Sequence, residues 1–358
     1  MSFDERAELA PGYTISRVIR GGWQLAGDHG EVARDAVNDD LAAFYDAGIT
    51  TFDCADIYTG VEEMYGDFRA ALRNKRGADA LAQLRIHTKY VPDLDALATL
   101  TAADVRRTID RSLQRLRMER LDLVQFHWWD YDQPRWRETA QVLAALQAEG
   151  KIALVGGTNF DTAHVQALAE TGVPFASLQV QYSLLDRRPA AGLVEACAAL
   201  GTQLLCYGSL AGGFLSDAWL GRPEPVGALA NRSLVKYKLI IDEFGGWALF
   251  QALLTTLRTV ADRHGSSIAA VASRWVLDRA NVAAVIVGAR HAGHLPATLA
   301  IGTLRLTPAD HAAIDAILAQ AQGPGGEVYA LERDRSGRHG SIMKYHLGEG
   351  AVTSGATQ

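Results

Sequence analysis

The most constraining feature of this sequence is a repeated alternation of two patterns that begins near residue 15. Short runs rich in β-branched and aromatic residues, each about as long as a β-strand, alternate with segments whose apolar residues recur at helical spacing. The alternation occurs eight times. The predicted strands occupy residues 18–22, 50–54, 85–89, 122–127, 152–156, 177–181, 203–207 and 284–288.

The segments between these strands are predicted to be amphipathic helices. One of them carries apolar residues at Val105, Ile109, Leu113 and Leu116. Glycines such as Gly150 follow the predicted helix ends, where a left-handed backbone is needed. Regular repetition of strand, helix and glycine indicates parallel βα units, whose sheet must be covered on both faces. Eight such units predict a closed (β/α)8 barrel, the TIM barrel.

A doubly wound sheet that binds a dinucleotide is the main alternative fold. Such sheets carry a GxGxxG motif between a strand and the next helix. No motif of this kind follows a predicted strand here, so the closed barrel is preferred.

Two stretches interrupt the alternation. Residues 208–246 follow the seventh strand, and because barrel enzymes place their active sites on loops after strands, this long loop is predicted to be a lid or cofactor clamp. Residues 323–358 form a polar C-terminal tail extension that could cap the pocket, pack against another subunit or stay mobile, and residues 351–358 are expected to be disordered. We expect one barrel domain over residues 1–322, followed by the tail.

The composition favours a globular protein that acts on small molecules. Apolar residues make up 48% and charged residues 21%, and the net charge of -6 disfavours binding to nucleic acid. The amino terminus lacks the apolar segment of a secretory signal, and no apolar run approaches the roughly 18 residues that span a bilayer. We therefore expect a cytoplasmic protein without a membrane partner.

The cysteines and histidines give no sign of a disulfide or a metal site. Cys54, Cys197 and Cys206 are odd in number and show no CxxC spacing, so they are predicted to be small buried apolar residues. The ten histidines form no HxH or HxxxH group, and no carboxylate pair accompanies a candidate ligand set. A hydrolytic or metal-dependent barrel enzyme is therefore disfavoured.

Polar side chains gather on one face of the second, third and fourth strands. Because side chains of a strand alternate between its two faces, Asp53, Lys89 and His127 can all point into the barrel near the strand ends. A buried carboxylate and a buried ammonium are both costly unless they are paired. Asp53 and Lys89, at corresponding ends of adjacent strands, are therefore predicted to form an ion pair.

Several segments, in order, resemble the aldo-keto reductase family. GlyIleThrThrPheAspCysAlaAspIleTyrThrGly with the later GluGluMetTyrGly, at residues 48–66, is similar to the family signature, and HisThrLys at 87–89 and ValGlnPheHis at 124–127 are similar to its next two catalytic strands. The resemblance extends from about Gly22 to Leu299. It implies a (β/α)8 barrel that exchanges a hydride between a nicotinamide cofactor and a carbonyl or alcohol.

The resemblance implies four catalytic residues, namely Asp53, Tyr58, Lys89 and His127. Tyr58 would exchange the proton with the substrate oxygen, on which negative charge develops during hydride transfer. Lys89 would lower the pKa of the phenol, and a decrease of about 2 requires about 2.7 kcal/mol, which one close cation can supply. Asp53 would keep Lys89 charged and oriented, and His127 would donate a hydrogen bond to the substrate oxygen.

The same resemblance implies the residues that hold the nicotinamide and the phosphates. Asn159, Thr158 and Gln179 would bind the carboxamide, Tyr207 would stack under the nicotinamide ring, and Asp53 could contact the ribose. Small-residue turns present backbone amides to anions, so the loop after the seventh strand is suited to the pyrophosphate. Its predicted residues are Ser209, Leu210, Gly212 and Leu215.

The adenosine end is implied to lie at residues 287–295, where Gly288, Arg290 and His294 match the family's 2′-phosphate loop in position. Arg290 is suited to a phosphate. His294 stands where Arg or Gln is more usual, and Ala297 and Thr298 replace the expected Glu and Asn. NADP(H) is therefore favoured as the cofactor, with NAD(H) also possible.

Aromatic residues are expected to line the substrate pocket, an arrangement that suits a flat or apolar aldehyde or ketone. Trp23 occupies the family's pocket position after the first strand and is also expected near the cofactor. Trp128 and Trp129 cannot both point inward from an extended segment, so at least one is expected to be structural. The candidate pocket residues are Trp23, Tyr90, Trp128 and Trp129.

Two other functions are compatible with the resemblance. The potassium-channel β subunits are cofactor-sensing regulatory proteins with this fold, but in them the histidine position is typically altered. A steroid double-bond reductase would be expected to carry Glu at that position. His127 disfavours both, whereas the substrate, the direction of reaction and the oligomeric state stay open.

Overall fold

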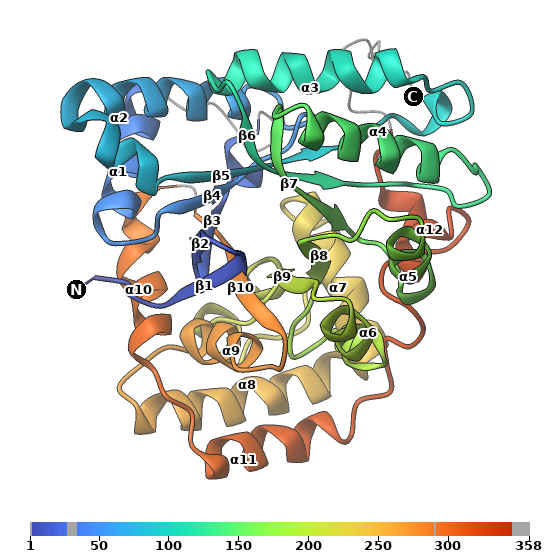
Figure 1. The fold of residues 1–358 in the computed structure, drawn as a ribbon. Coiled ribbons are helices and arrows are strands. Elements are labelled where there is room, and N and C mark those ends of the chain that lie inside the picture. The colour runs from blue at the N-terminus through green and yellow to red at the C-terminus, as the bar shows by residue number, and fades with distance from the viewer. Residues whose placement is uncertain (1, 27–33, 290, 346–358) are drawn as a thin grey trace.

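A computed structural model describes residues 2–26, 34–289 and 291–345 of the chain, and Figure 1 shows it as a closed barrel of strands surrounded by helices. All eight barrel strands are parallel, and they follow one another around the barrel in chain order until the last strand pairs with the first. This architecture confirms the predicted (β/α)8 barrel. The strands are β3 (Val18–Gly21), β4 (Thr51–Asp53), β5 (Arg85–Tyr90), β6 (Leu121–Phe126), β7 (Ile152–Thr158), β8 (Ser177–Gln181), β9 (Gln203–Tyr207) and β10 (Val282–Gly288).

An outer ring of helices covers the barrel. The helix with the predicted stripe begins at the cap residue Thr101, whose hydroxyl accepts a hydrogen bond from the amide of Asp104, and it buries Val105, Ile109 and Leu116. Gly150, after the fourth helix, has a φ of 84°, as the predicted helix end requires. The ring consists of α1 (Arg34–Asp46), α2 (Val61–Gln83), α3 (Ala102–Leu116), α4 (Trp136–Ala148), α5 (Thr162–Glu170), α6 (Leu193–Ala199), α9 (Ile268–Leu277) and α10 (Leu295–Thr303).

A hairpin that the sequence patterns did not predict precedes the barrel. Strands β1 (Arg6–Ala10) and β2 (Tyr13–Ser16) pair antiparallel in a separate sheet. Leu9 and Ile15 of this hairpin belong to one apolar cluster with the barrel residues Ile19, Leu123 and Leu205. The hairpin thus packs against the interior side chains of the barrel, away from the strand ends that carry Asp53 and Lys89.

The segment after β9 contains helical structure where a loop was expected. Two short 3₁₀ turns, Ala211–Gly213 and Asp217–Trp219, lead into α7 (Arg232–Phe244), and α8 (Gly246–Arg263) follows after a single glycine. Asn231 begins α7, because its side chain accepts a hydrogen bond from the amide of Leu234. A helix thus forms much of the predicted clamp.

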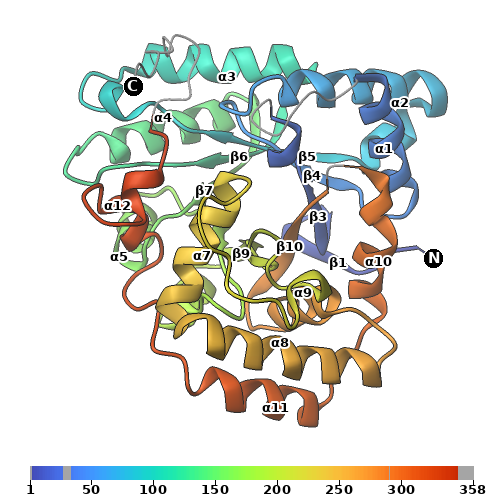
Figure 2. The same ribbon diagram turned by 180° about the vertical axis from the view of Figure 1, so that it is seen from behind.

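The tail lies across the barrel end that carries the polar strand residues. After α11 (Pro308–Leu318), which packs beside α8, the chain runs to α12 (Ala330–Arg333), and Figure 1 shows α12 beside α5. In Figure 2, α12 and α7 lie on the same side of the barrel. The tail residue Tyr329 contacts His127 at this end of the barrel, and capping of the pocket by the tail stays a prediction. Residues 351–358 lie outside the described residues. No described helix is both long and apolar enough to cross a membrane.

Candidate active site

A buried ion pair lies at the carboxyl ends of neighbouring strands. The ammonium Nζ of Lys89, on β5, donates to Oδ2 of Asp53, on β4, at 2.6 Å and to the carbonyl oxygen of Cys54 at 2.8 Å. Oδ1 of Asp53 accepts hydrogen bonds from the amide groups of Gln125 at 2.9 Å and Gln179 at 2.7 Å. Both charged side chains are about 5% exposed. The predicted ion pair is therefore confirmed, and two glutamines hold its carboxylate.

The electrostatic surroundings keep Lys89 charged. Burial lowers the pKa of its ammonium, but the neighbouring Asp53 carboxylate and the Tyr58 phenol raise it by more, so the net pKa lies above that of a free lysine. Lys89 is thus a permanent cation at this end of the barrel.

Tyr58 lies on the loop after β4, directly above this cation. The Lys89 ammonium is 4.9 Å from the centroid of the Tyr58 ring, and the Trp23 ring meets the Tyr58 ring edge-on with 5.0 Å between centroids. These contacts place the Tyr58 phenol between the Lys89 ammonium and the Trp23 ring.

The pKa of Tyr58 differs in direction from the expectation. Burial among neighbouring side chains raises the pKa of the phenol, the Lys89 ammonium opposes this rise, and the net change is upward. Lys89 thus lowers the pKa of Tyr58, as predicted, but the loss of water around the phenol raises this pKa by more. The Tyr58 phenol is therefore neutral at physiological pH.

His127 follows β6 and is 2% exposed. Its Nδ1 lies 3.1 Å from the carbonyl oxygen of Thr158, and its ring stands edge-on to the rings of Trp129 and Tyr329, with centroid distances of 4.3 and 5.5 Å. Burial lowers the pKa of His127 to about 3, assisted by the charge of Arg333. With this pKa the imidazole is neutral at physiological pH. The role of His127 as a hydrogen-bond donor to the substrate oxygen stays a prediction.

The residues expected at the nicotinamide are brought together at the ends of β7, β8 and β9. Asn159, directly after Thr158, has a φ of 61°, and its side-chain oxygen accepts a hydrogen bond from the Tyr207 hydroxyl at 2.8 Å. The amide group of Gln179 donates to Asp53 and to Gln125. Of the predicted carboxamide and stacking residues, Gln179 thus contacts the buried ion pair, and Asn159 contacts Tyr207.

The loop predicted to hold the pyrophosphate packs against α7. A Cβ atom on Gly208 would lie 2.4 Å from the Tyr237 hydroxyl, and one on Gly212 would lie 2.8 Å from the ring of Tyr237, so only glycine fits beneath this helix. Leu215 is fully buried, and its amide donates to the carbonyl oxygen of Leu210. Ser209 is buried against Ser273, with 3.2 Å between the hydroxyl oxygens. Within the described residues, the backbone amides of Ser209 and Leu210 donate no hydrogen bond.

The adenosine end is described only in part, because Arg290 lies outside the described residues. Gly288 is the last residue of β10, and the Gln24 side chain packs against it. The His291 and His294 rings stack with 4.7 Å between centroids, and burial together with His291 lowers the pKa of His294. The Asp40 carboxylate accepts a hydrogen bond from the amide of Ala292 at 2.7 Å. A carboxylate and a neutral imidazole thus border this loop.

Two of the four predicted pocket residues lie elsewhere. Tyr90 follows the inward-facing Lys89 on β5, so its ring points outward and stacks on Phe126 in the core. Trp128 is completely buried, and its indole NH donates to the carbonyl oxygens of Asp130 and Gln133. The prediction of these two as pocket residues was wrong, since alternation along the strand turns them away from the barrel interior.

The other two pocket candidates border two of the predicted catalytic residues. Trp23 contacts Tyr58, and Trp129 contacts His127. The indole NH of Trp129 donates to the carbonyl oxygen of Pro92 at 2.9 Å, which fixes the ring beside the imidazole. As expected, only one of the two adjacent tryptophans is placed at the site.

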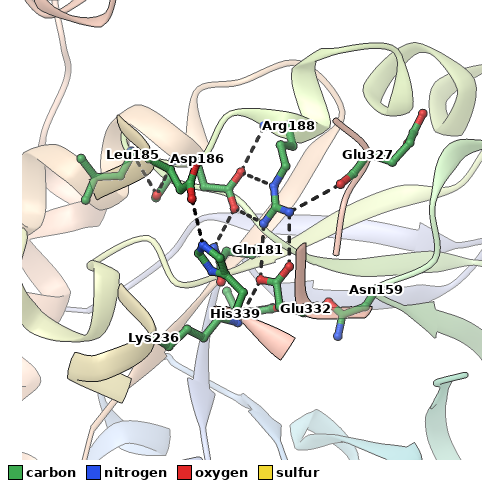
Figure 3. A network of polar contacts seen from close by, with 12 residues as sticks. Asn159, Gln181, Leu185, Asp186, Arg188, Lys236, Glu327, Glu332 and His339 are labelled. Carbon is green, nitrogen blue, oxygen red and sulfur yellow. Dashed lines mark hydrogen bonds and ion pairs between the residues drawn. The ribbon is translucent and has the colours of Figure 1, made fainter. Parts of the chain in front are cut away.

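A buried charge network that the sequence did not reveal fastens the tail to the barrel. Figure 3 shows Arg188, on the loop after β8, between the carboxylates of Asp186 and Glu332. The closest contacts of the Arg188 guanidinium to these carboxylates are 2.7 and 3.2 Å, and Gln181 donates to Asp186 at 2.6 Å. Lys236 on α7 lies 3.6 Å from Glu332. Burial raises the pKa of Glu332, but Lys236 and Arg188 outweigh it and lower the pKa to about 2.

Arg333, the next residue of the tail, connects the tail to the loops after β6 and β7. One of its guanidinium nitrogens donates to the carbonyl oxygens of Trp128 and Asn159 and to the Tyr131 hydroxyl. Tyr329, four residues earlier, lies against His127 and beneath the Lys236 ammonium, 5.7 Å from its ring centroid. The tail therefore supplies an aromatic ring to the site, and no local pattern in the sequence distinguishes this tyrosine from others.

The comparisons with known proteins agree with this geometry. The model of the Aldo/keto reductase family matches residues 17–319. The chain is 24% identical over 319 residues to the NADH-specific methylglyoxal reductase of Escherichia coli K12, covering 83% of this chain and 93% of that protein. It is 28% identical over 263 residues to flagellar radial spoke protein 5 of Chlamydomonas reinhardtii, covering 63% of this chain and spanning about half, 49%, of that longer protein.

Among solved structures, the glycerol dehydrogenase AKR11B4 of Gluconobacter oxydans is similar, with a TM-score of 0.76 and 26% identity. The match covers 91% of this chain and 98% of that one. Together with the closed barrel, the buried Asp53–Lys89 pair and the adjacent Tyr58, the family match leads to one conclusion. The chain belongs to the aldo/keto reductase family.

Proposed function

We propose that this protein is an NAD(P)H-dependent oxidoreductase that interconverts an aldehyde or ketone and an alcohol, with Tyr58 as general acid and base. The proposal is carried by one observation: the Lys89 ammonium, held by the buried Asp53 carboxylate, lies 4.9 Å from the centroid of the Tyr58 ring. The names of two relatives, a methylglyoxal reductase and a glycerol dehydrogenase, support a small carbonyl or alcohol as substrate.

The nicotinamide cofactor, when bound, supplies or takes up the hydride. During reduction, the Tyr58 hydroxyl gives its proton to the substrate oxygen, on which negative charge develops. The resulting charge on the phenol faces the Lys89 ammonium. The upward-shifted pKa of Tyr58 suits this role, because the phenol stays protonated until the transition state draws the proton away. Asp53 keeps the ammonium in place.

The residues around the ion pair fit a nicotinamide cofactor. Asn159 and Gln179 present amide groups beside the Tyr207 ring, on which the nicotinamide would stack, and Thr158 adjoins them. The open amides of Ser209 and Leu210 fit the pyrophosphate, and Gly212 and Leu215 complete that loop. Trp23 would border the nicotinamide from the opposite wall.

We propose that NADP(H) is favoured, with NAD(H) also accepted. Arg290 supports the preference for a 2′-phosphate, because its guanidinium can pair with phosphate oxygens. The Asp40 carboxylate and the depressed pKa of His294 act against a strong preference, since they add no positive charge. Gly288 and His294 would border the adenosine.

The substrate would enter between Trp23, Trp129 and the tail residue Tyr329, each of which contacts a catalytic side chain. The proposed partners are therefore a small carbonyl compound or alcohol and the cofactor, without nucleic acid or a membrane. A cytoplasmic location, favoured by three buried cysteines without disulfides, stays a prediction.

A panel of aldehydes, ketones and alcohols, followed by the absorbance of NADPH and NADH, tests the proposal. We expect reduction of several carbonyl compounds. Tight cofactor binding without turnover of any panel member would contradict it and favour a cofactor-sensing regulatory protein similar to the potassium-channel β subunits.

A further inference from the structure

Lys236 lies among three aromatic rings, one of which is the ring on which the nicotinamide would stack. Its ammonium is 5.3 Å from the ring centroid of Tyr207, 5.6 Å from that of Tyr237 and 5.7 Å from that of Tyr329. These rings belong to β9, to α7 and to the tail. Three separate parts of the chain therefore hold one cation beside the proposed nicotinamide site.

This lysine is charged although its side chain is only 17% exposed. Figure 3 shows its ammonium near the Glu332 carboxylate, at 3.6 Å. Burial lowers the pKa of the ammonium, and Glu332 opposes this decrease. The pKa of Glu332 is about 2, so its carboxylate is ionised at neutral pH and favours the charged form of Lys236.

The Glu332 carboxylate cancels the charge of Lys236 only in part. Glu332 also contacts the Arg188 guanidinium, at a shorter distance of 3.2 Å, so two cations share its negative charge. Lys238, two residues further along α7, differs in this respect, because its ammonium lies 2.7 Å from Glu224 and 2.5 Å from Asp242. Lys236 thus places positive charge beside the Tyr207 ring.

The two redox forms of a nicotinamide differ in charge, since the oxidised ring is positive and the reduced ring is neutral. Stacked aromatic rings have centroids about 4.5 Å apart, so a nicotinamide on either face of Tyr207 would lie within about 10 Å of the Lys236 ammonium. At an effective dielectric constant of about 20, one charge at that distance changes the affinity for a second charge by about 10-fold. The neutral, reduced ring would not experience this repulsion.

We propose, on the basis of the proposed function, that Lys236 weakens the binding of the oxidised cofactor relative to the reduced cofactor, because its ammonium repels the positively charged nicotinamide. In this role Lys236 acts at a distance and takes no part in the transfer of the hydride or the proton. The preference suits carbonyl reduction, since the reduced cofactor binds more tightly and the oxidised product dissociates readily.

The test is the ratio of two dissociation constants, Kd for NADP+ over Kd for NADPH, measured by fluorescence on the full chain. In Lys236→Met we expect this ratio to fall by about 3- to 10-fold, less than the full repulsion because Glu332 opposes part of it. Lys236→Arg, which keeps the charge, should keep the ratio. The matched control Lys238→Met, on the same helix, should keep it as well.

The ratio separates this role from a contact with the phosphates. Both redox forms carry the same phosphates, so the loss of such a contact in Lys236→Met would change both dissociation constants equally. An unchanged ratio would therefore overturn the inference and leave the proposed function intact. If the unmodified protein binds neither redox form, the proposed function itself is contradicted.

Glu332→Gln provides a second test, of opposite sign. This substitution removes the negative charge that opposes Lys236, so the ratio of Kd for NADP+ over Kd for NADPH should rise. A ratio that stays the same or falls in Glu332→Gln would count against repulsion by Lys236. If Lys236→Met does not fold, the result with Glu332→Gln decides.

Discussion

The ammonium of Lys89 lies 2.6 Å from the carboxylate of Asp53 and 4.9 Å from the centroid of the Tyr58 ring. The Lys89 ammonium is thus held by the buried Asp53 carboxylate and faces the Tyr58 phenol. Two glutamines satisfy the second carboxylate oxygen, so the pair stays charged without water. In the proposed mechanism, this arrangement would stabilise the negative charge that develops on the phenol, while Tyr58 stays protonated at rest.

Replacing Lys89 by methionine should reduce both stability and activity, and a second substitution at Asp53 should separate the two effects. The Asp53 carboxylate would be left buried without its counter-ion, so we expect the free energy of unfolding to fall by about 3–5 kcal/mol and carbonyl reduction to fall at least 100-fold. The double variant Lys89→Met with Asp53→Asn should recover much of the stability and none of the activity. Urea unfolding and steady-state kinetics check both. A double variant that regains activity would contradict the role given to the ammonium.

The pH dependence of reduction follows from two pKa shifts. The acid must be protonated, so the rate is lost as the pH rises through the pKa of Tyr58, which burial raises above its ordinary value near 10. The His127 ring, with its pKa lowered to about 3, should contribute no change near pH 6.5. We therefore expect a flat kcat for reduction between about pH 6 and pH 9. An alkaline decline with a midpoint near pH 8 would argue against a phenol with a raised pKa.

Cofactor preference should depend on Arg290. Arg290→Ala should lower kcat/KM for NADPH by about 10-fold, because a guanidinium pairing with the 2′-phosphate is lost. NADH has no such phosphate and serves as the internal control, so its kcat/KM should stay unchanged. An equal decrease for both cofactors would show that Arg290 acts on the shared part of the molecule or on the fold.

The charge network of the tail should stabilise the protein in a pH-dependent manner. Glu332→Gln should reduce the free energy of unfolding by about 1.5–3 kcal/mol near pH 7. The pKa of Glu332 is about 2 in the folded protein, compared with about 4.3 for a free glutamate. Its stabilisation is therefore complete above pH 4.3 and is lost as the pH falls toward 2.

The matched control is Glu327→Gln, which removes an exposed carboxylate of the same tail. Glu327 accepts hydrogen bonds from Thr162, and the side-chain oxygen of a glutamine can still accept them. Urea unfolding at pH 7 and pH 3 should show a difference between Glu332→Gln and the unmodified protein that shrinks at the lower pH, and little effect of Glu327→Gln. A destabilisation by Glu332→Gln that does not change with pH would contradict a stabilising role of its charge.

The barrel could be predicted because its signals are local. The apolar run at 152–156 became part of β7, and the alternation that placed Asp53 and Lys89 inward produced their ion pair. The same alternation turns Tyr90 outward. The inward position of its neighbour Lys89 predicts this orientation better than the aromatic character of Tyr90 does. Helix α7 was missed because glycines flank it and the segment was expected to be a loop.

The contacts that complete the site are not local, and for that reason the sequence could not predict them. Arg188 meets Glu332 across 144 positions of sequence, and Tyr329 reaches His127 from a polar tail. Nδ1 of His127 contacts the carbonyl oxygen of Thr158 on another strand, and no residue type reveals this contact. The burial that raises the pKa of Tyr58 is likewise a property of the folded surroundings.

The most direct test of the account is the turnover of Tyr58→Phe, which removes one oxygen atom and keeps the ring between Lys89 and Trp23. We expect carbonyl reduction to fall by about 10²–10⁴-fold, while the dissociation constant of the cofactor, measured by fluorescence, stays within about 3-fold. Reduction at a rate near that of the unmodified enzyme would show that another group supplies the proton, and it would contradict the central claim.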